Sequence, residues 1–468
     1  MKKIVSLAAA ALLSTSLLAN ADMQAQIDSL SKEVKKLQKD QKRTKKTLNK
    51  VKAHDAYDNI KFSVDFRNAV EVLNYKDNDS GETASNDSLL TSKLFLNMKA
   101  APMNGLVFYG KLAIYSMWGG HLNYTGDGTS TAPTTSTGLK DWSGSSKASD
   151  TVMRVKEAYF AYADEFGDQP WTLSIGRRPS SNGCLANYRE NEDLPGSPLA
   201  HITNMEVNAM MLQLNWDRFI EGAYSKFVYG RAHTGIIENL YGVGTGTDSS
   251  PFSPYAETGD DDDDVDFFVF LGDGFNNGQV QVMYQWAHIF NTKGKNLDTD
   301  GVKKAAGTAD LGAISVKIDG LSEDNEFLEN TIVFASYAMT YYDPKEDYSI
   351  FNRTTTSVGD SYWIGAVFPD GFTEAGKFGI EYNHGSKRWT PMTWAEDTAI
   401  GSKIAVRGNA YEAYWNFDLF GVKYLPSQIR YTYAQHDYTP NVKCAGWIES
   451  QKVDMTASDL RFAISYRY

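Results

Sequence analysis

From Ile60 to its end, the chain repeats one pattern about sixteen times: apolar and polar residues alternate, and clusters of Gly, Pro, Asn and Asp separate the segments. A period of two places apolar side chains on one face of a β-strand and polar ones on the other. Long connections, such as 75–88, 119–149, 179–204, 291–311 and 385–402, alternate with short ones, such as 163–169. An outer-membrane barrel has this order, because its turns are short on the periplasmic side and its loops are long outside.

We therefore predict an all-β transmembrane fold, an antiparallel up-and-down β-barrel of about 16 strands over residues 60–468. Ambiguous alternation in 151–162, 224–236 and 403–417 leaves fourteen or eighteen strands open. The last segment is the clearest, and it ends on an aromatic residue. Such an ending is similar to the signal by which outer-membrane barrels are recognised for assembly. The residues that carry this similarity are Phe462, Ile464, Tyr466 and Tyr468.

The first 21 residues have the pattern of a secretory signal. Lys2 and Lys3 precede an apolar run over 4–18, which is followed by the small residues Ala19 and Ala21. This run is shorter than the roughly 20 residues that span a bilayer, so we favour cleavage after Ala21 over an uncleaved anchor. The mature protein is expected in the cell envelope.

Residues 22–52 carry an unbroken heptad pattern and are predicted to form an α-helical coiled coil. Ten basic and four acidic side chains make the segment positive, and 53–59 form a linker to the barrel. With an even number of strands, the coil lies in the periplasm. The pattern favours self-association but leaves the number of helices open. Its a and d positions are Ile27, Leu30, Val34, Leu37, Gln41, Thr44, Leu48 and Val51.

Composition excludes several other classes. A hydrophobic content of 42% and a mean hydropathy of −0.41 exclude a bundle of membrane-spanning helices. A net charge of −12 disfavours nucleic acid as a partner. The seven histidines are isolated and no glycine-rich phosphate loop precedes a helix pattern, so we expect neither an enzyme nor a cofactor. Catalysis by His121 or His201 beside loop carboxylates is the remaining enzymatic alternative.

The polar face of the predicted strands carries more basic than acidic side chains, and these are candidates to line a pore. Because charged rings bias which ion enters a pore, the excess predicts a weak preference for anions. The competing interpretation is that these side chains pair with carboxylates of neighbouring strands. The candidates are Arg67, Lys93, Lys111, Arg178, Lys377, Glu381, Arg430 and Arg461.

Two features lie in connections that we predict to be external. Five consecutive acids repel one another unless cations are close, so they are expected either to gather divalent ions shared with lipopolysaccharide or to remain a solvated run. Cys184 and Cys444 are predicted to lie in two different external loops, where a disulfide and two free thiols are both open. The acids are Asp260, Asp261, Asp262, Asp263 and Asp264.

Three segments, Ser174–Ser181, Gly379–Ser386 and Arg407–Ala413, resemble recurring stretches of a bacterial outer-membrane family that is known only as a domain of unknown function. The resemblance implies a signal peptide, a coiled coil and a barrel in this order, but it implies no transported solute. More loosely, the chain is similar to trimeric porins with a periplasmic coiled coil, which favours a trimer.

Three functions remain open for such a protein in the outer membrane of a Gram-negative bacterium. The first is a porin-like channel for passive diffusion of small hydrophilic solutes or ions. The second is a ligand-specific channel with a saturable site. The third is a structural or adhesive protein whose coil is a periplasmic tether. Lipid and lipopolysaccharide are the expected surroundings in all three.

Overall fold

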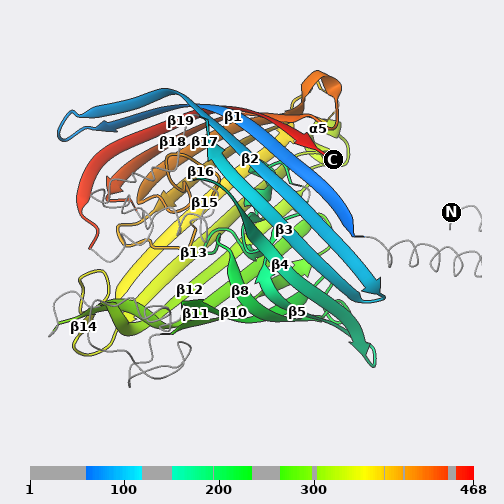
Figure 1. Cartoon of the computed structure of the whole chain (residues 1–468), viewed down its shortest axis with the longest axis horizontal. Helices are drawn as coiled ribbons and strands as arrows, with labels where there is room; N and C mark the ends of the chain where they lie inside the picture. Colours follow the sequence, from blue (N-terminus) through cyan, green and yellow to red (C-terminus); the bar gives the residue numbers. More distant parts are fainter. Residues whose placement is uncertain are drawn as a thin grey trace, which may run out of the picture. The chain divides into compact units, whose positions relative to one another are not determined.

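The computed structural model describes residues 60–118, 150–192, 194–233, 264–297, 303–373, 375–393, 396–440 and 449–468. The predicted signal peptide, coiled coil and linker lie outside the described residues. The chain divides into two units, and the larger one, Ile60–Ala101 with Gly105–Tyr468, is a β-barrel (Figure 1).

Sixteen long strands among the described residues form the wall. They are β1 (Lys61–Asp77), β2 (Thr83–Met103), β3 (Leu106–Met117), β4 (Asp150–Phe166), β5 (Gln169–Arg178), β8 (Val207–Asn215), β9 (Tyr224–His233), β10 (Val265–Asn276), β11 (Val280–Asn296), β12 (Lys303–Asp319), β13 (Ile332–Pro344), β15 (Ser357–Pro369), β16 (Lys377–Gly385), β17 (Gly408–Asp418), β18 (Pro426–Tyr438) and β19 (Lys452–Arg467).

Short elements complete the described part of the chain. A two-residue strand pairs with β11, and two short strands pair in parallel with each other. The short elements are β6 (Gly183–Cys184), α4 (Ala186–Arg189), β7 (Gly196–Leu199), α5 (Glu326–Glu329), β14 (Tyr348–Ser349) and the 3₁₀ turn η2 (Leu419–Gly421).

The wall closes on itself. Successive wall strands are antiparallel neighbours, and β1 pairs both with β2 and with the last strand, β19. In the closing pair, Val72 lies opposite Leu460 and Glu71 lies opposite Arg461. Closure leaves no strand edge facing lipid. The prediction of an antiparallel up-and-down barrel with about sixteen strands is confirmed.

Two of the predicted long loops are wrong. The strands β1 and β2 continue through most of 75–88, so that only 78–82 connect them, and β11 and β12 likewise fill most of 291–311. The pairs Tyr75–Ala84 and Lys295–Lys303 extend these two hairpins. Beyond the lipid both faces of a hairpin meet water, so the alternation that reveals a strand disappears there.

The outer face of the barrel is apolar and the inner face is polar. Along β19, Leu460 is 46% exposed and its neighbour Asp459 only 1%. No helix among the described residues is long and apolar enough to cross a membrane. A closed antiparallel barrel with an apolar outer belt is the architecture of outer-membrane proteins. The protein is therefore an outer-membrane β-barrel. Outward residues include Phe62, Phe66, Phe160, Trp286, Ile314, Ile380, Tyr431, Phe462 and Tyr466.

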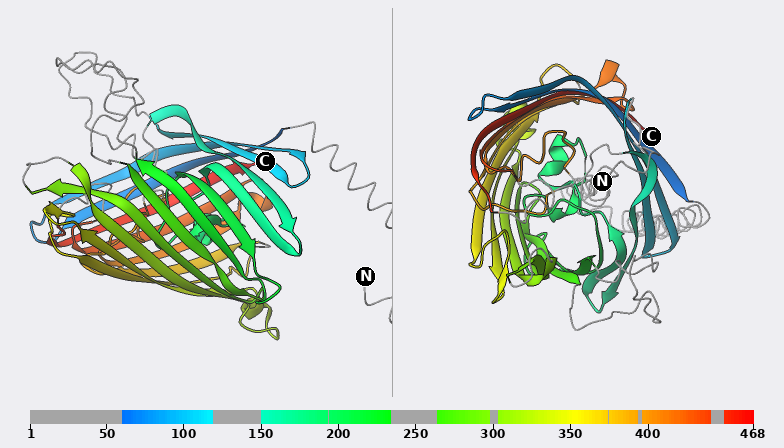
Figure 2. Two further views of the ribbon diagram at one scale, coloured as in Figure 1. Left: turned by 90° about the horizontal axis from the view of Figure 1, so that it is seen from below. Right: turned by 60° about the vertical axis from the view of Figure 1, so that its left-hand side comes forward.

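Two connections that we expected outside the cell fold into the barrel instead. We call residues 179–206 the first inner segment and residues 386–407 the second inner segment. Leu185 and Ile202 of the first, and Trp389 and Ile404 of the second, are buried against inward residues of the wall. Figure 2 shows α4 within the ring of strands. The prediction that these connections are external is wrong, because their apolar residues find a partner surface inside the barrel.

Candidate functional site inside the barrel

The first inner segment crosses the lumen and is held by hydrogen bonds from the opposite wall. Asn416 Nδ2 on β17 donates to the Tyr188 carbonyl at 3.0 Å, and Gln428 Nε2 on β18 donates to the Arg189 carbonyl at 2.5 Å. The Tyr188 carbonyl also accepts from the Asn191 amide at 3.2 Å. No further helical turn supplies a donor to the Arg189 carbonyl, and the side chain of Gln428 takes this role. These contacts hold Arg189 inside the barrel, beside β17 and β18.

Near its C-terminal end, the first inner segment is anchored by a buried histidine. His201 Nδ1 lies 2.7 Å from Ser336 Oγ, and its Nε2 lies 2.9 Å from Ser361 Oγ. Its ring also meets Trp363 and Trp389 edge-on. Burial lowers the pKa of His201 to about 3. The imidazole is therefore neutral at pH 7 and has a structural role in this site.

The two inner segments are joined by their backbones. The Met392 amide donates to the Ile202 carbonyl at 3.0 Å, and the Asn204 amide donates to the Met392 carbonyl at 2.7 Å. Within the second segment, Trp389 Nε1 donates to the Ile404 carbonyl at 2.7 Å. The two segments therefore form one connected structure inside the barrel.

Asp397 of the second inner segment lies among four cations of the wall. Its carboxylate pairs with Arg67, with Lys93 Nζ at 3.1 Å and with Arg461 Nη1 at 3.3 Å. Arg430 Nη2 donates to its carbonyl at 2.5 Å. Burial alone would raise the pKa of Asp397, but the nearby cations hold it well below its usual range. This residue stays ionised, and it ties the second segment to β1, β2, β18 and β19.

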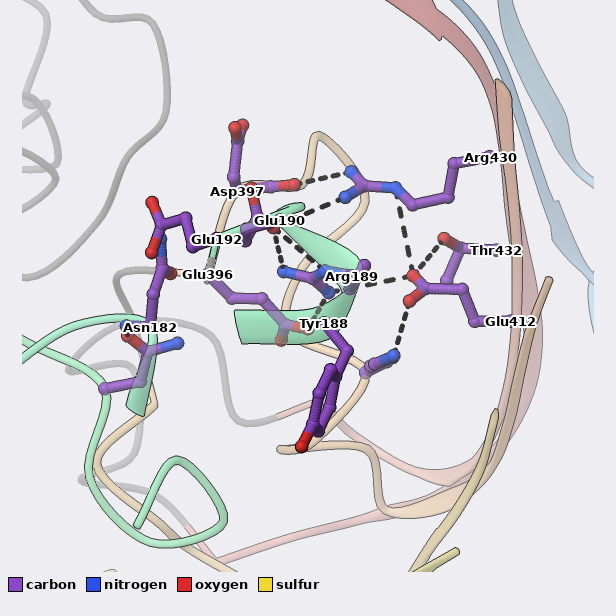
Figure 3. Close-up of polar contacts among 12 residues, drawn as sticks. Asn182, Tyr188, Arg189, Glu190, Glu192, Glu396, Asp397, Glu412, Arg430 and Thr432 are labelled. Atoms are coloured by element: carbon purple, nitrogen blue, oxygen red, sulfur yellow. Dashed lines mark hydrogen bonds and ion pairs between the residues drawn. The ribbon is translucent and has the colours of Figure 1, made fainter. Parts of the chain in front are cut away.

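Arg189 has the corresponding role for the first inner segment (Figure 3). It pairs with Glu396, with Glu190 at 2.8 Å and with Glu412 of β17 at 3.6 Å. Burial would lower the pKa of its guanidinium, but these carboxylates raise it well above its usual value. Lys403 pairs with Glu412 and, at 2.6 Å, with Glu381 of β16.

We call this set of buried ion pairs the ionic network. Its members come from both inner segments and from six strands of the wall, and the charges of opposite sign balance. Burial of such charges is tolerated only because each finds partners. The six cations are Arg67, Lys93, Arg189, Lys403, Arg430 and Arg461, and the six carboxylates are Glu71, Glu190, Glu381, Glu396, Asp397 and Glu412.

Two cavities lie beside the inner segments. One of about 390 Å³ is lined by Gln281, Asp319 and Lys377, which lie near the short turns. Another of about 160 Å³ is lined by Glu71 and by Met117, which ends β3 at the opposite rim. The ionic network and the inner segments thus occupy part of the lumen.

The eight predicted pore-lining residues fall into two groups. Arg67, Lys93, Glu381, Arg430 and Arg461 belong to the ionic network. Their partners include carboxylates of neighbouring strands, as the competing interpretation held, and others come from the inner segments.

The other pore-lining candidates lie apart from the ionic network. Lys111 pairs with Glu157 of β4 at 2.6 Å. Arg178 is buried at the end of β5, with Nη1 donating to Ser174 Oγ. Lys377 is exposed at the start of β16.

The remaining predicted sites are only partly described. Asp264 pairs with Arg231, and the other four acids of the cluster lie outside the described residues. Cys184 lies on β6 inside the barrel, not in an external loop, and burial raises the pKa of its thiol to about 11. Cys444 is also outside the described residues, so its pairing with Cys184 stays a prediction.

The sequence reasoning missed the charged residues of the inner segments. Arg189, Glu190, Glu396, Asp397 and Lys403 stand in polar connections, where charges are ordinarily solvated. Nothing in their spacing separates a charge that meets water from one that is paired inside a barrel. Among the described residues, no group of three His, Cys, Asp or Glu side chains could hold a metal ion.

Solved structures with a similar fold include three outer-membrane proteins. An anion-selective porin from Comamonas acidovorans is 12% identical, with a TM-score of 0.49, and the match covers 88% of this chain and 100% of that one. OprB of Pseudomonas putida is 12% identical, with a TM-score of 0.47 and coverages of 90% and 96%. OmpT of Vibrio cholerae is 12% identical, with a TM-score of 0.45 and coverages of 87% and 97%.

No curated protein matches this sequence. The model of one family, described as "Protein of unknown function (DUF3373)", matches residues 83–463. This match covers the wall strands from β2 to β18 and most of β19, together with both inner segments. The chain therefore belongs to the DUF3373 family.

Proposed function

We propose that this protein is an outer-membrane channel that lets small hydrophilic solutes or ions diffuse through a lumen narrowed by the two inner segments. The observation that carries the proposal is the ionic network, which lies inside a closed barrel of sixteen strands, a size at which porins keep an aqueous channel. A core packed without water is built from apolar side chains, whereas six buried cations with their carboxylates are typical of a lumen that contains water.

We also propose a weak preference for anions, and we assign it to Arg178 and Lys226. The bases of the ionic network are matched by carboxylates, so they add little net charge. Among the residues that the structure describes, neither Arg178 nor Lys226 pairs with a carboxylate; Arg178 donates to Ser174, and Lys226 Nζ donates to Ser197 Oγ at 3.3 Å. Two such cations in a narrow lumen favour anions modestly.

Conductance of the refolded protein in a planar bilayer tests both statements. We expect discrete channel steps in KCl and, under a KCl gradient, a reversal potential of the sign that marks anion selectivity. The double variant R178Q/K226Q should move this potential toward zero, whereas Lys423→Gln in an exposed short turn should leave it unchanged. Absence of channel steps would contradict the proposed function and favour a structural role, and clear cation selectivity would contradict the anion preference alone.

A saturable ligand site is the second candidate function. It is favoured by the extent to which the inner segments fill the lumen, because a solute that passes must contact them. Block of the KCl conductance by one solute at low concentration would support this candidate. Conductance that falls in proportion to solute size, without saturation, would support passive diffusion.

We further propose a trimer held by the coiled coil over residues 22–52. The heptad pattern supports self-association, because a helix with an apolar seam associates with copies of itself. The number three is supported by the resemblance to trimeric porins with a periplasmic coiled coil. Sedimentation in detergent should give three chains per particle for the mature protein and one for a variant that lacks 22–52. A trimer that persists without this segment would place the contacts on the barrel instead.

A further inference from the structure

An apolar cavity lies inside the barrel, apart from the ionic network. Its volume is about 90 Å³, and its wall is made by inward side chains of β8 to β12. Both inner segments cover it, the first through Met205 and the second through Met392. The wall side chains include Val228, Phe267, Val269, Leu271, Ile289 and Leu311.

This space is larger than ordinary packing leaves. Protein interiors contain few voids that exceed one water molecule, and a water needs roughly 10–15 Å³ of such space together with polar partners. The lining here is almost wholly apolar, so water gains little by entering. Apolar cavities of about 150 Å³ stay dry and bind benzene. A cavity of about 90 Å³ suits a slimmer group, such as a short aliphatic chain.

One end of the cavity is cationic. Arg178 lines it directly, and Lys226 reaches it through Ser197, whose Oγ accepts the Lys226 Nζ proton at 3.3 Å. The guanidinium carbon of Arg178 also lies 5.4 Å from the centre of the Tyr159 ring. Within the described ranges, neither cation has a carboxylate partner. A buried cation without one is a favourable place for an anionic ligand group.

We propose that this cavity binds short-chain aliphatic monocarboxylates, with the hydrocarbon tail among β8 to β12 and the carboxylate on Arg178 and Lys226. The inference deepens the proposed function, on which it rests, by naming a solute class for the same lumen. The two methionines of the lid are flexible enough to admit a tail longer than the empty cavity. Because both inner segments form this lid, an occupied cavity also affects how the constriction is closed.

Calorimetric titration of the full mature protein in detergent with hexanoate tests the proposal, with a titration into detergent alone subtracted. We expect saturable binding of hexanoate, weaker binding of acetate, which lacks the tail, and weaker binding of hexan-1-ol, which lacks the charge. Arg178→Gln should weaken hexanoate binding about tenfold, which corresponds to about 1.4 kcal/mol, because the carboxylate loses a charged hydrogen-bond donor. The same variant should leave binding of hexan-1-ol unaffected. Failure of hexanoate to bind, or equal binding of hexanoate and hexan-1-ol, would overturn the proposal.

A filling variant locates the site. Ala287 lines the cavity from β11, so Ala287→Leu should abolish hexanoate binding. The matched control is Ala335→Leu on the lipid face of β13, which should bind hexanoate as the wild type does. Heat-modifiable migration in gels shows whether each variant is folded. Normal hexanoate binding by a folded Ala287→Leu variant would place the site elsewhere and overturn the proposal.

The KCl conductance of the same preparation separates this inference from the proposed function. Channel steps without hexanoate binding would overturn the carboxylate site and leave the channel intact. Hexanoate binding without channel steps would contradict the proposed function while supporting the site itself.

Discussion

The two sides of the lumen hold the inner segments by different means. On the side of β16 to β19, β1 and β2, Asp397 and Arg189 bind the segments through the ionic network. On the side of β8 to β12, Ile202 and Trp389 pack in an apolar cluster, which borders the cavity. Ion pairs need exact partners, whereas apolar packing tolerates a gap. The charged side therefore fixes where the segments lie, and the apolar side leaves room for a ligand.

The largest effect is expected when the charged side is broken at Asp397. Asp397→Asn leaves Arg67, Lys93 and Arg461 close together without their shared carboxylate, and loss of one partner of a buried ion pair costs about 3–5 kcal/mol. The second inner segment should detach, so single-channel conductance should rise and anion selectivity should increase. Bilayer recordings check both changes.

The control for this variant is Asp168→Asn. Asp168 and Arg218 form a pair at 3.8 Å whose side chains are 90% and 71% exposed. Exposed pairs contribute little to stability, so conductance and selectivity should stay as in the wild type. An unchanged conductance for Asp397→Asn as well would show that the ionic network does not hold the segment.

A somewhat smaller effect is expected on the apolar side. Ile202→Ala removes a fully buried side chain from the first inner segment, at a cost of about 2–5 kcal/mol. Because no charge changes, conductance should rise while the reversal potential under a KCl gradient stays constant. A shift of the reversal potential as large as that of Asp397→Asn would mean that the two sides are not separable.

The third effect concerns pH. Burial lowers the pKa of His201 from its ordinary value of 6.5 to about 3. Folding therefore favours the neutral imidazole, and protonation of His201 favours the unfolded chain. The contribution of the neutral His201 to the free energy of unfolding is fully present above pH 6.5 and is lost as the pH falls from 6.5 toward 3. At pH 5 the expected loss is about 2 kcal/mol.

Thermal unfolding at pH 7 and pH 5 measures this loss. The wild type should lose more stability than His201→Gln between the two pH values, since glutamine does not titrate. Groups such as Glu192, which are common to both proteins, cancel in the comparison. Equal pH dependence of the two proteins would contradict the role of His201 as a neutral anchor.

The sequence was enough to predict the wall but not its contents. Strand alternation is local, so the outward set that includes Leu460 and Phe462 can be read from neighbouring residues alone. The positions of Arg189 and Asp397 depend on residues more than two hundred places away in the sequence. The residue type alone does not show whether a charged side chain is paired or solvated. The apolar residues Ile202 and Trp389 were the available hint, because external loops seldom need such side chains.

The most direct test of the inward position of these segments is thiol labelling from outside the cell. In a background without the two native cysteines, Thr393→Cys marks the buried second inner segment, and Ser80→Cys marks the exposed turn between β1 and β2. A bulky, membrane-impermeant maleimide should label Ser80→Cys within minutes and leave Thr393→Cys unlabelled in the folded barrel. Equal labelling of both would show that residues 386–407 lie outside, and would contradict the constriction on which the proposed function depends.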